Sequence, residues 1–356
     1  CVGFASFYYG LSTMYNIMFN IKDSKEKFIY SFDPYYIYSI TFNESNDCDR
    51  GLKFNETFDK LMKIGAKKLF YPPFTSCDTK WTVNKFRNTI SYTKPYSINT
   101  WYEMDVNDRR FLNTSKALIS NKIPVIVGFA VVPSMYSASS RNLNGVNSSG
   151  LWDPSELEEI QGGHALCVIG YDDYKYGGAF KIVNSWGSDY GENGYMWVKY
   201  SDYKEFAREA YVIELNDNVK KGPPAKILQG NYKRFDYRNS SNSLSNYEGQ
   251  YLNSSVSGYG IWKASDIGSY YVGKFTNALL NGFVLYVNDD GIYSANAVNG
   301  KLNDFNKFKS FGFAADEELM ETQLEAKRYF SRLGNDLSIR KANSSRVNST
   351  SPPKND

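Results

Sequence analysis

Two stretches near the beginning of the chain place apolar residues three or four positions apart, as one face of a helix requires. In residues 1–20 few charges interrupt this pattern, which predicts a buried helix that begins at or near Cys1. Its apolar positions are Phe4, Tyr8, Leu11, Tyr15 and Met18. In residues 54–64 a similar apolar stripe predicts a second helix, and Gly65, a common helix terminator, follows it directly.

Short runs of β-branched and aromatic residues, bounded by Gly, Asn or Asp, follow further along and predict strands. These runs are residues 124–132, 165–171, 179–183, 195–200 and 210–215. A helical first half followed by a strand-rich second half is typical of an α+β domain whose two halves face each other. We assign this domain to residues 1–216.

A polar segment separates the first domain from a different pattern. Residues 217–230 contain Gly-Pro-Pro, which resists both helix and central strand, and are interpreted as a linker. Beyond them, Tyr-x-Gly at 247–249 recurs at 271–273, and Gly258 recurs as Gly282, both after 24 residues. Two features with one offset favour a true repeat over coincidence in a segment rich in Gly, Tyr and Asn.

The repeat segment, residues 231–313, is therefore predicted to be a small all-β domain. Residues 314–334 follow with apolar positions at helical intervals, early acids and late bases, which predicts a C-terminal helix. From residue 335 to 356 the chain is dominated by Ser, Asn, Lys and Pro with few large apolar residues, so we expect a disordered tail.

Composition narrows the class of protein. Of 356 residues, 42% are hydrophobic and 22% are charged, which suits a globular fold. The net charge of +3 gives no electrostatic reason to expect nucleic acid as a partner. The longest apolar run, residues 123–132, is about half as long as a membrane-spanning helix, so no transmembrane segment is expected. Because the chain opens on Cys1 without a methionine or a charged leader, we expect a processed or truncated product.

Cysteine and histidine usage limits the metal chemistry that is open to this chain. The cysteines are Cys1, Cys48, Cys77 and Cys167, and no two of them form a C-x-x-C pair. His164 is the only histidine, which excludes a histidine-rich metal site. We expect neither a metal nor a cofactor.

His164 stands after Gly162 and Gly163 at the head of an apolar run, and two roles compete for it. A lone histidine beside a strand is often hydrogen-bonded for structural reasons alone. The two glycines, however, remove side chains where a ligand backbone would need close approach. Further on, Asn184 can accept the imidazole N–H and fix which nitrogen stays free, and Trp186 can shield that bond from water. This arrangement favours a general base.

A general base needs a nucleophile. No G-x-S-x-G motif, which would indicate an activated serine, occurs in the chain. Cys1 is predicted at the start of a buried helix, where unpaired N–H groups and the helix dipole favour a thiolate. Cys167 is the alternative, but it lies three positions beyond His164 in a predicted strand and therefore on the opposite face. We interpret Cys167 as an inert core thiol.

These residues resemble a known family. The segments CVGFAS at 1–6, GGHALCVIGYDD at 162–173 and IVNSWGSDYGENGYMWV at 182–198, in this order, are similar to papain-like cysteine peptidases, bacterial members in particular. The resemblance covers residues 1–216. It implies a papain-like two-lobed domain, with a helical lobe and a β-barrel-like lobe.

The same resemblance implies roles for single residues. It makes Cys1 the nucleophile, His164 the general acid and base, and Asn184 the residue that orients the imidazole. The substrate-binding residues that it implies are Gly51, Gly163 and Trp186. The N–H group of Cys1 would form half of an oxyanion hole.

Several positions depart from the family pattern. In the family a glutamine upstream of the nucleophile completes the oxyanion hole, and its absence here is what truncation would produce. Val2 stands where the family usually has Trp, and Arg50 replaces the first of two glycines. Cys48 and Cys77 match positions that are disulfide-bonded in relatives, and a bridge between them would imply an oxidising, extracytoplasmic compartment.

The spacing within residues 231–313 resembles degenerate MORN repeats, which stack small β-hairpins against one another. That resemblance implies contact with a protein or lipid partner, or a purely structural role. For the whole chain, hydrolysis of peptide bonds through a thioester on Cys1 competes with two alternatives. One is a catalytically inactive papain-like scaffold that acts through its repeats, and the other is an amidase that uses the amine of Cys1 as its base. The joint presence of Cys1, His164 and Asn184 favours the peptidase.

Overall fold

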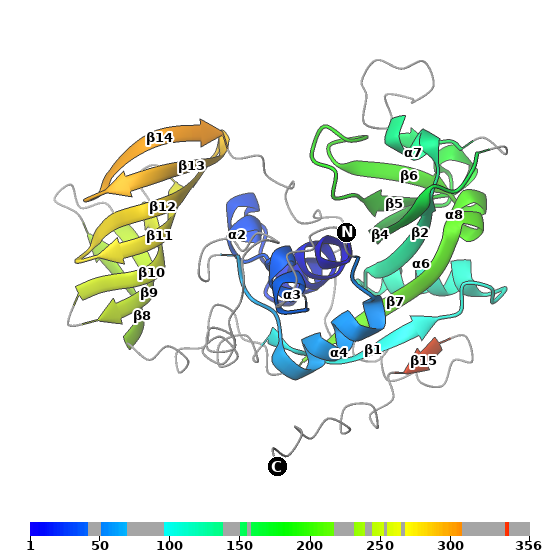
Figure 1. Ribbon diagram of the computed structural model, residues 1–356, viewed down its shortest axis with the longest axis horizontal. Coiled ribbons are helices and arrows are strands. Elements are labelled where there is room, and N and C mark those ends of the chain that lie inside the picture. The colour runs from blue at the N-terminus through cyan, green and yellow to red at the C-terminus, as the bar shows by residue number, and fades with distance from the viewer. Residues whose placement is uncertain are drawn as a thin grey trace, which may run out of the picture.

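The computed structural model contains two β-sheets and a group of helices (Figure 1). It describes residues 1–41, 51–69, 96–137, 150–154, 158–216, 231–238, 244–252, 255–264, 268–307 and 339–341. Predictions that concern Cys48, Arg50 and Cys77, the linker at 217–230 and the helix at 314–334 lie outside these residues. The α+β character of the first domain and the β-structure of the second are confirmed.

The buried helix predicted at the start of the chain is present. It comprises η1 (Phe4–Leu11), which is π-helical, and α1 (Ser12–Met18), and most of its side chains are buried. Gly3 is needed at its beginning, because a Cβ there would overlap the carbonyl oxygen of Pro34. Pro34 is the first residue of α3 (Pro34–Thr41), so the two helices meet at that point.

The first domain contains further helices besides this buried one. Helix α2 (Ser24–Ile29) is capped by Asp23, whose carboxylate accepts the Glu26 N–H at 2.9 Å. Helix α4 (Phe54–Ile64) has the predicted bounds and ends at Gly65, whose φ of 75° suits glycine. The others are α6 (Phe111–Ser120), α7 (Pro133–Ser137), the 3₁₀ turn η3 (Lys175–Gly177) and α8 (Tyr200–Phe206). Within the described residues no helix has the length and apolar character needed to cross a membrane.

An eight-stranded sheet forms the other half of the first domain, in the order β15-β1-β7-β2-β4-β5-β6-β3. Its strands are β1 (Ile98–Met104), β2 (Val125–Val131), β3 (Leu151–Trp152), β4 (Gly162–Asp172), β5 (Ala179–Val183), β6 (Tyr195–Lys199), β7 (Ala207–Leu215) and β15 (Ile339–Lys341). Figure 1 shows α2 and α3 on one side of the N-terminus and β4, β5 and β6 on the other. The helical half and the strand half therefore face each other, as predicted.

The five strands predicted in the first domain are all present, with one difference that matters for the site. Strand β4 begins at Gly162 instead of residue 165, so His164 lies inside the strand and is paired with Phe129 of β2. Glycine disfavours strands, which is why the pattern placed the start later. In the fold, Gly162 and Gly163 extend the strand because β2 provides partners for both.

The second domain is an antiparallel sheet of seven strands that are paired in chain order, β8 to β14. Its strands are β8 (Asn231–Arg238), β9 (Leu244–Leu252), β10 (Ser255–Ala264), β11 (Ser269–Thr276), β12 (Leu279–Asn288), β13 (Gly291–Val298) and β14 (Lys301–Lys307). The 24-residue offset has a structural counterpart, because Gly258 in β10 and Gly282 in β12 both have positive φ, 98° and 81°. Equivalent glycines thus share a backbone conformation that other residues rarely adopt.

The tail that we expected to be disordered contains an ordered strand. Ile339–Lys341 forms β15, which pairs antiparallel with β1 so that Ile339 lies opposite Met104 and Lys341 opposite Tyr102. Three residues carry too weak a pattern to indicate a strand in the sequence. Pairing with an existing sheet edge, which no local pattern reveals, supplies their backbone hydrogen bonds.

One face of the second sheet packs against the helical half of the first domain. Its buried side chains Ile261, Tyr270, Val272, Leu285, Val287 and Ile292 belong to the same apolar cluster as Phe28 and Ile29 of α2. Polar contacts surround them: Lys25 pairs with Asp289 at 2.7 Å, and the Tyr270 hydroxyl donates to Glu26 at 3.2 Å. The two domains therefore share one apolar core.

A shared core predicts that the second sheet contributes to the stability of the first domain. We expect Leu285→Ala to lower the free energy of unfolding by about 2 to 4 kcal/mol, because Leu285 is 4% exposed and leaves a cavity. Phe283→Ala, two residues away and 41% exposed, is the matched control and should cost far less. Urea unfolding followed by tryptophan fluorescence measures both, and equal losses for the two variants would contradict the shared core.

Candidate active site

A hydrogen bond joins the only histidine to Asn184. His164 Nε2 lies 2.8 Å from Asn184 Oδ1, and because an amide oxygen only accepts, Nε2 carries the proton and Nδ1 keeps a free lone pair. The Ser185 N–H donates to the same oxygen at 2.7 Å, which fixes the orientation of the amide. The fold thus selects one tautomer of His164 and leaves Nδ1 as its basic atom.

Long-range contacts hold Asn184 in place. It follows the last residue of β5 and is 1% exposed, and its N–H donates to the Gly194 carbonyl at 3.0 Å. Its own carbonyl accepts a hydrogen bond from the Tyr9 hydroxyl at 3.1 Å. Tyr9 lies in η1, so the helix that follows Cys1 is tied directly to the residue that positions His164.

Two aromatic rings stack in succession on the imidazole of His164, which is hydrogen-bonded to Asn184. The Trp186 ring lies 4.8 Å from the His164 ring at an interplanar angle of 26°, and the Tyr136 ring lies 5.1 Å from Trp186 at 10°. Tyr136 comes from α7 and is 50% exposed. Trp186 was expected to shield the bond. Tyr136 was not, because its sequence neighbourhood gives no signal and only the fold brings it to Trp186.

The surroundings of His164 favour a neutral imidazole. Burial lowers the pKa of His164 and its hydrogen bond to Asn184 opposes that shift, with the net result that the pKa is lowered to about 4. An imidazolium at neutral pH consequently requires a nearby negative charge, such as a thiolate.

The two described cysteine thiols differ in their exposure and in their place in the fold. Cys1 is exposed and precedes η1, and its carbonyl accepts the Ala5 N–H at 2.9 Å. In Figure 1 the N-terminus lies between the helices and β4. Cys167 is fully buried in β4, and burial raises the pKa of its thiol well above the ordinary value. The interpretation of Cys167 as an inert core thiol is consistent with both observations.

Three glycines of the first domain have no described atom close to the position that a side chain would take. Gly51, Gly162 and Gly163 are exposed, and a Cβ built on any of them would meet no described atom within 4 Å. Gly51 precedes α4 on the helical half, whereas Gly163 is adjacent to His164 on the strand half. Among the described residues no group of three His, Cys, Asp or Glu side chains could hold a metal ion.

Comparison with known proteins identifies the family. Residues 25–214 match the family described as papain family cysteine protease, which is more than half of the chain. The chain belongs to the papain family of cysteine proteases. Enzymes of this kind are hydrolases, and they act on protein substrates. The matched residues include His164 and Asn184, whereas Cys1 precedes them.

Individual relatives of this papain-family protein are distant. An uncharacterized peptidase C1-like protein of Acanthamoeba polyphaga mimivirus is 33% identical over 109 residues, which are 30% of this chain and 32% of the relative. The chain thus spans about a third of the length of that curated relative. Among solved structures, xylellain from Xylella fastidiosa has 21% identity and a TM-score of 0.45, with 60% of this chain and 78% of that chain covered. Bromelain from Ananas comosus has 16% identity and a TM-score of 0.41, with 61% and 89% covered.

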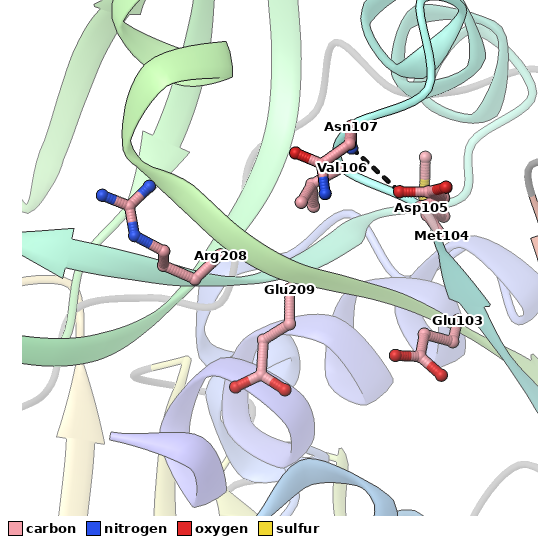
Figure 2. Close-up of a pocket in the computed structure, with 7 residues that line it drawn as sticks. All are labelled: Glu103, Met104, Asp105, Val106, Asn107, Arg208 and Glu209. Carbon is pink, nitrogen blue, oxygen red and sulfur yellow. Dashed lines mark hydrogen bonds between the residues drawn. The ribbon is translucent and has the colours of Figure 1, made fainter.

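A pocket of about 220 Å³ lies where β1 ends and β7 begins in this papain-family domain (Figure 2). It is lined by Glu103, Met104, Asp105, Val106, Asn107, Arg208 and Glu209. None of these residues belongs to a motif that marks it in the sequence. Their proximity results from the antiparallel pairing of β1 with β7, in which Met104 lies opposite Ala210.

Proposed function

We propose that this papain-family protein hydrolyses peptide bonds through a thioester on Cys1, with His164 as general acid and base and Asn184 as the residue that orients the imidazole. The observation that carries the proposal is the 2.8 Å bond from His164 Nε2 to Asn184 Oδ1 beneath Trp186. That bond leaves Nδ1 as the one imidazole atom able to exchange a proton with Cys1.

In the first half of the reaction, Nδ1 of His164 takes the proton of the Cys1 thiol and the thiolate attacks the carbonyl carbon of the substrate. The tetrahedral oxyanion accepts a hydrogen bond from the N–H group of Cys1. Nδ1 then donates its proton to the leaving nitrogen, the C–N bond breaks and the amine departs. The acyl group remains on Cys1 as a thioester.

In the second half, water replaces the amine. Nδ1 takes a proton from the water, the resulting hydroxide attacks the thioester carbon, and the C–S bond breaks to release the carboxylic acid. His164 then shares its proton with the thiolate of Cys1 and the starting state returns. The stacked Trp186 ring keeps bulk water from the bond between His164 and Asn184 throughout, so the imidazole keeps its orientation in both halves.

Gly51 and Gly163 are proposed to contact the substrate backbone. One lies on the helical half and the other on the strand half, and the space above both is free of described atoms. An extended peptide offers N–H and C=O groups along both edges, so main-chain contact with two glycines holds it without regard to its side chains. Side-chain preference must then come from other residues.

Alkylation of Cys1 with iodoacetamide at about pH 5.5, followed residue by residue with mass spectrometry, tests the proposal. An ordinary thiol is almost fully protonated at that pH, so we expect rapid labelling only if His164 stabilises the thiolate. His164→Ala should slow the labelling of Cys1 by about 100-fold. Cys167, buried in the same molecule, is the internal control and should stay unlabelled in both proteins.

Slow labelling of Cys1 at equal rates in the two proteins would contradict the proposal. It would favour the alternative of a catalytically inactive papain-like scaffold that acts through its second domain. Circular dichroism spectra of both proteins must coincide, so that a loss of reactivity is not a loss of fold.

For the second domain we propose MORN-like repeats that contact a protein or a lipid surface. Support comes from the shared positive φ of Gly258 and Gly282 and from the in-register aromatic stack of Trp262 on Tyr271, with ring centroids 5.0 Å apart. Vesicle co-sedimentation with and without anionic lipid, compared for the wild type and Phe283→Ala, separates the two kinds of partner, since only a lipid-binding sheet would sediment.

A further inference from the structure

We infer that Tyr9 is a positioning residue of this peptidase. Its hydroxyl group fixes the peptide unit between Asn184 and Ser185, and through that unit the orientation of the His164 imidazole. The inference rests on the proposed function and adds to it a residue from helix η1. It is carried by three successive hydrogen bonds that lead from η1 to the imidazole.

The peptide unit between Asn184 and Ser185 connects the first two of these hydrogen bonds. Its carbonyl oxygen, which belongs to Asn184, accepts the Tyr9 hydroxyl at 3.1 Å. Its N–H group, which belongs to Ser185, donates to Asn184 Oδ1 at 2.7 Å. Because a peptide unit is planar and rigid, its C=O and N–H groups turn together. A hydroxyl that holds the carbonyl therefore also holds the N–H group.

The third hydrogen bond transmits this constraint to the catalytic base. Asn184 Oδ1 accepts the Ser185 N–H and also lies 2.8 Å from His164 Nε2. If the peptide unit turned, the Ser185 N–H would leave Oδ1, and the Asn184 amide would be free to rotate about its side-chain bonds. His164 would then lose the acceptor that selects its tautomer. Tyr9 consequently acts on the imidazole through Asn184.

The Tyr9 hydroxyl is a dependable donor because the side chain is buried. Tyr9 is 1% exposed, and its ring makes an edge contact with Tyr8 at 5.1 Å. Burial raises the pKa of Tyr9 above its ordinary value, and the nearby Tyr195 and Cys167 raise it further, so the hydroxyl keeps its proton at neutral pH. Asn184 is equally buried, so without the hydroxyl its carbonyl would be an unpaired acceptor in the interior.

Helix η1 has an uncommon geometry at the position of Tyr9. The Ser12 N–H donates to the Phe7 carbonyl, five residues back, where an α-helix would use the residue four back. The Ser12 hydroxyl donates to the same carbonyl at 2.9 Å. Such π-helical turns are rare and occur frequently at functional sites. The unusual turn of this helix thus coincides with the residue that reaches Asn184.

The bond from Tyr9 to Asn184 also connects the two halves of the site. The Cys1 carbonyl accepts the Ala5 N–H of η1, so the nucleophile is continuous with the helix that carries Tyr9. Asn184 and His164 belong to the strand half. A thiol and an imidazole exchange a proton only when they are aligned, and a misplacement of about 1 Å can reduce the rate by about 100-fold. Tyr9 therefore couples the helix of the nucleophile to the residue that orients the base.

The variant Tyr9→Phe removes the hydroxyl and keeps the ring. We expect kcat for a fluorogenic peptide to fall by about 10- to 100-fold, because a misoriented imidazole transfers protons poorly. KM should stay within about two-fold of the wild type, since Tyr9 is buried away from the substrate. Tyr15→Phe is the matched control. It removes an equally buried hydroxyl from α1, where the Tyr15 ring lies 5.5 Å from Phe32, and should leave kcat within about two-fold.

Nuclear magnetic resonance of the imidazole provides a readout that is independent of activity. His164 is the only histidine, so ¹⁵N-histidine labelling gives the two ring-nitrogen signals of a single residue. In a Cys1→Ala background at neutral pH no thiolate is present to keep the imidazole protonated. One fixed tautomer then gives two widely separated signals, from protonated Nε2 and unprotonated Nδ1. Adding Tyr9→Phe should bring these signals closer together, because the second tautomer becomes populated, whereas adding Tyr15→Phe should leave them unchanged.

Nitrogen signals that stay at their original positions in Tyr9→Phe would overturn the inference whatever the change in kcat, because the imidazole would then keep its tautomer without the hydroxyl. An equal loss of kcat in Tyr9→Phe and Tyr15→Phe would overturn it too, since any buried hydroxyl of the helix would have the same effect. A wild type that hydrolyses no peptide contradicts the proposed function instead, and the nitrogen signals then still decide whether Tyr9 orients His164. Circular dichroism spectra of all variants must coincide with that of the wild type.

Discussion

Replacing His164 by alanine should lower kcat/KM for peptide hydrolysis by at least about a thousand-fold. The variant loses both the base that activates Cys1 and the acid that protonates the leaving nitrogen. Any residual rate would come from substrate binding and the oxyanion contact alone, which are independent of the imidazole. Initial rates with a fluorogenic peptide at pH 7, measured at substrate concentrations below KM, give the ratio directly.

Gln161→Ala is the matched control for this loss of activity. Gln161 is exposed and lies three residues before His164, and its backbone N–H donates to the Val131 carbonyl at 2.8 Å. Alanine keeps that backbone bond, so activity should stay within about two-fold of the wild type, as surface substitutions generally do. A similar loss in both variants would mean that the chain segment directly before β4, and not the imidazole, determines the rate.

Removing the positive charge of Lys67 should destabilise the fold by about 3 to 5 kcal/mol. Lys67 Nζ lies 2.6 Å from Asp33 Oδ2, and both side chains are fully buried. Burial lowers the pKa of Lys67, and the attraction of Asp33 opposes that shift. Lys67→Met would leave the Asp33 carboxylate without its cation in an apolar interior. Urea unfolding of the wild type and of the variant measures the difference.

The double variant Lys67→Met, Asp33→Leu tests the cause of that loss. With both charges gone, no uncompensated charge remains, so we expect most of the lost stability to return. If the double variant is as unstable as Lys67→Met alone, the ion pair is not the source of the effect. Activity assays on the double variant are informative too, because Asp33 directly precedes Pro34, the residue that contacts Gly3 beside Cys1.

Local sequence patterns were sufficient to predict those helices and strands whose two ends are marked in the sequence itself. Helix α4 and strand β5 have the predicted bounds, because a terminal glycine or a compact apolar run defines each end. The pairing of His164 with Asn184 could also be proposed from the sequence, because an amide oxygen can accept the imidazole N–H and fix its orientation. The hydrogen bond that the fold forms between them agrees with that proposal.

The residues that sequence analysis missed around the site depend on contacts between distant segments. Tyr136 meets Trp186 only because α7 packs beside the loop after β5. Tyr9 reaches Asn184 across 175 positions of sequence. No periodicity or spacing encodes such contacts, because each depends on how whole elements pack.

Strand β15 determines how the second sheet is connected to the peptidase sheet. The chain leaves the peptidase sheet at the end of β7 and returns to it as β15, and these two strands flank β1 on either side. In the sequence, the second sheet is thus inserted between two strands of the peptidase sheet and does not simply follow the last of them. Cutting the chain after residue 216 would strip β1 of a neighbour and expose the N–H and C=O groups of residues 102–104 as a new sheet edge.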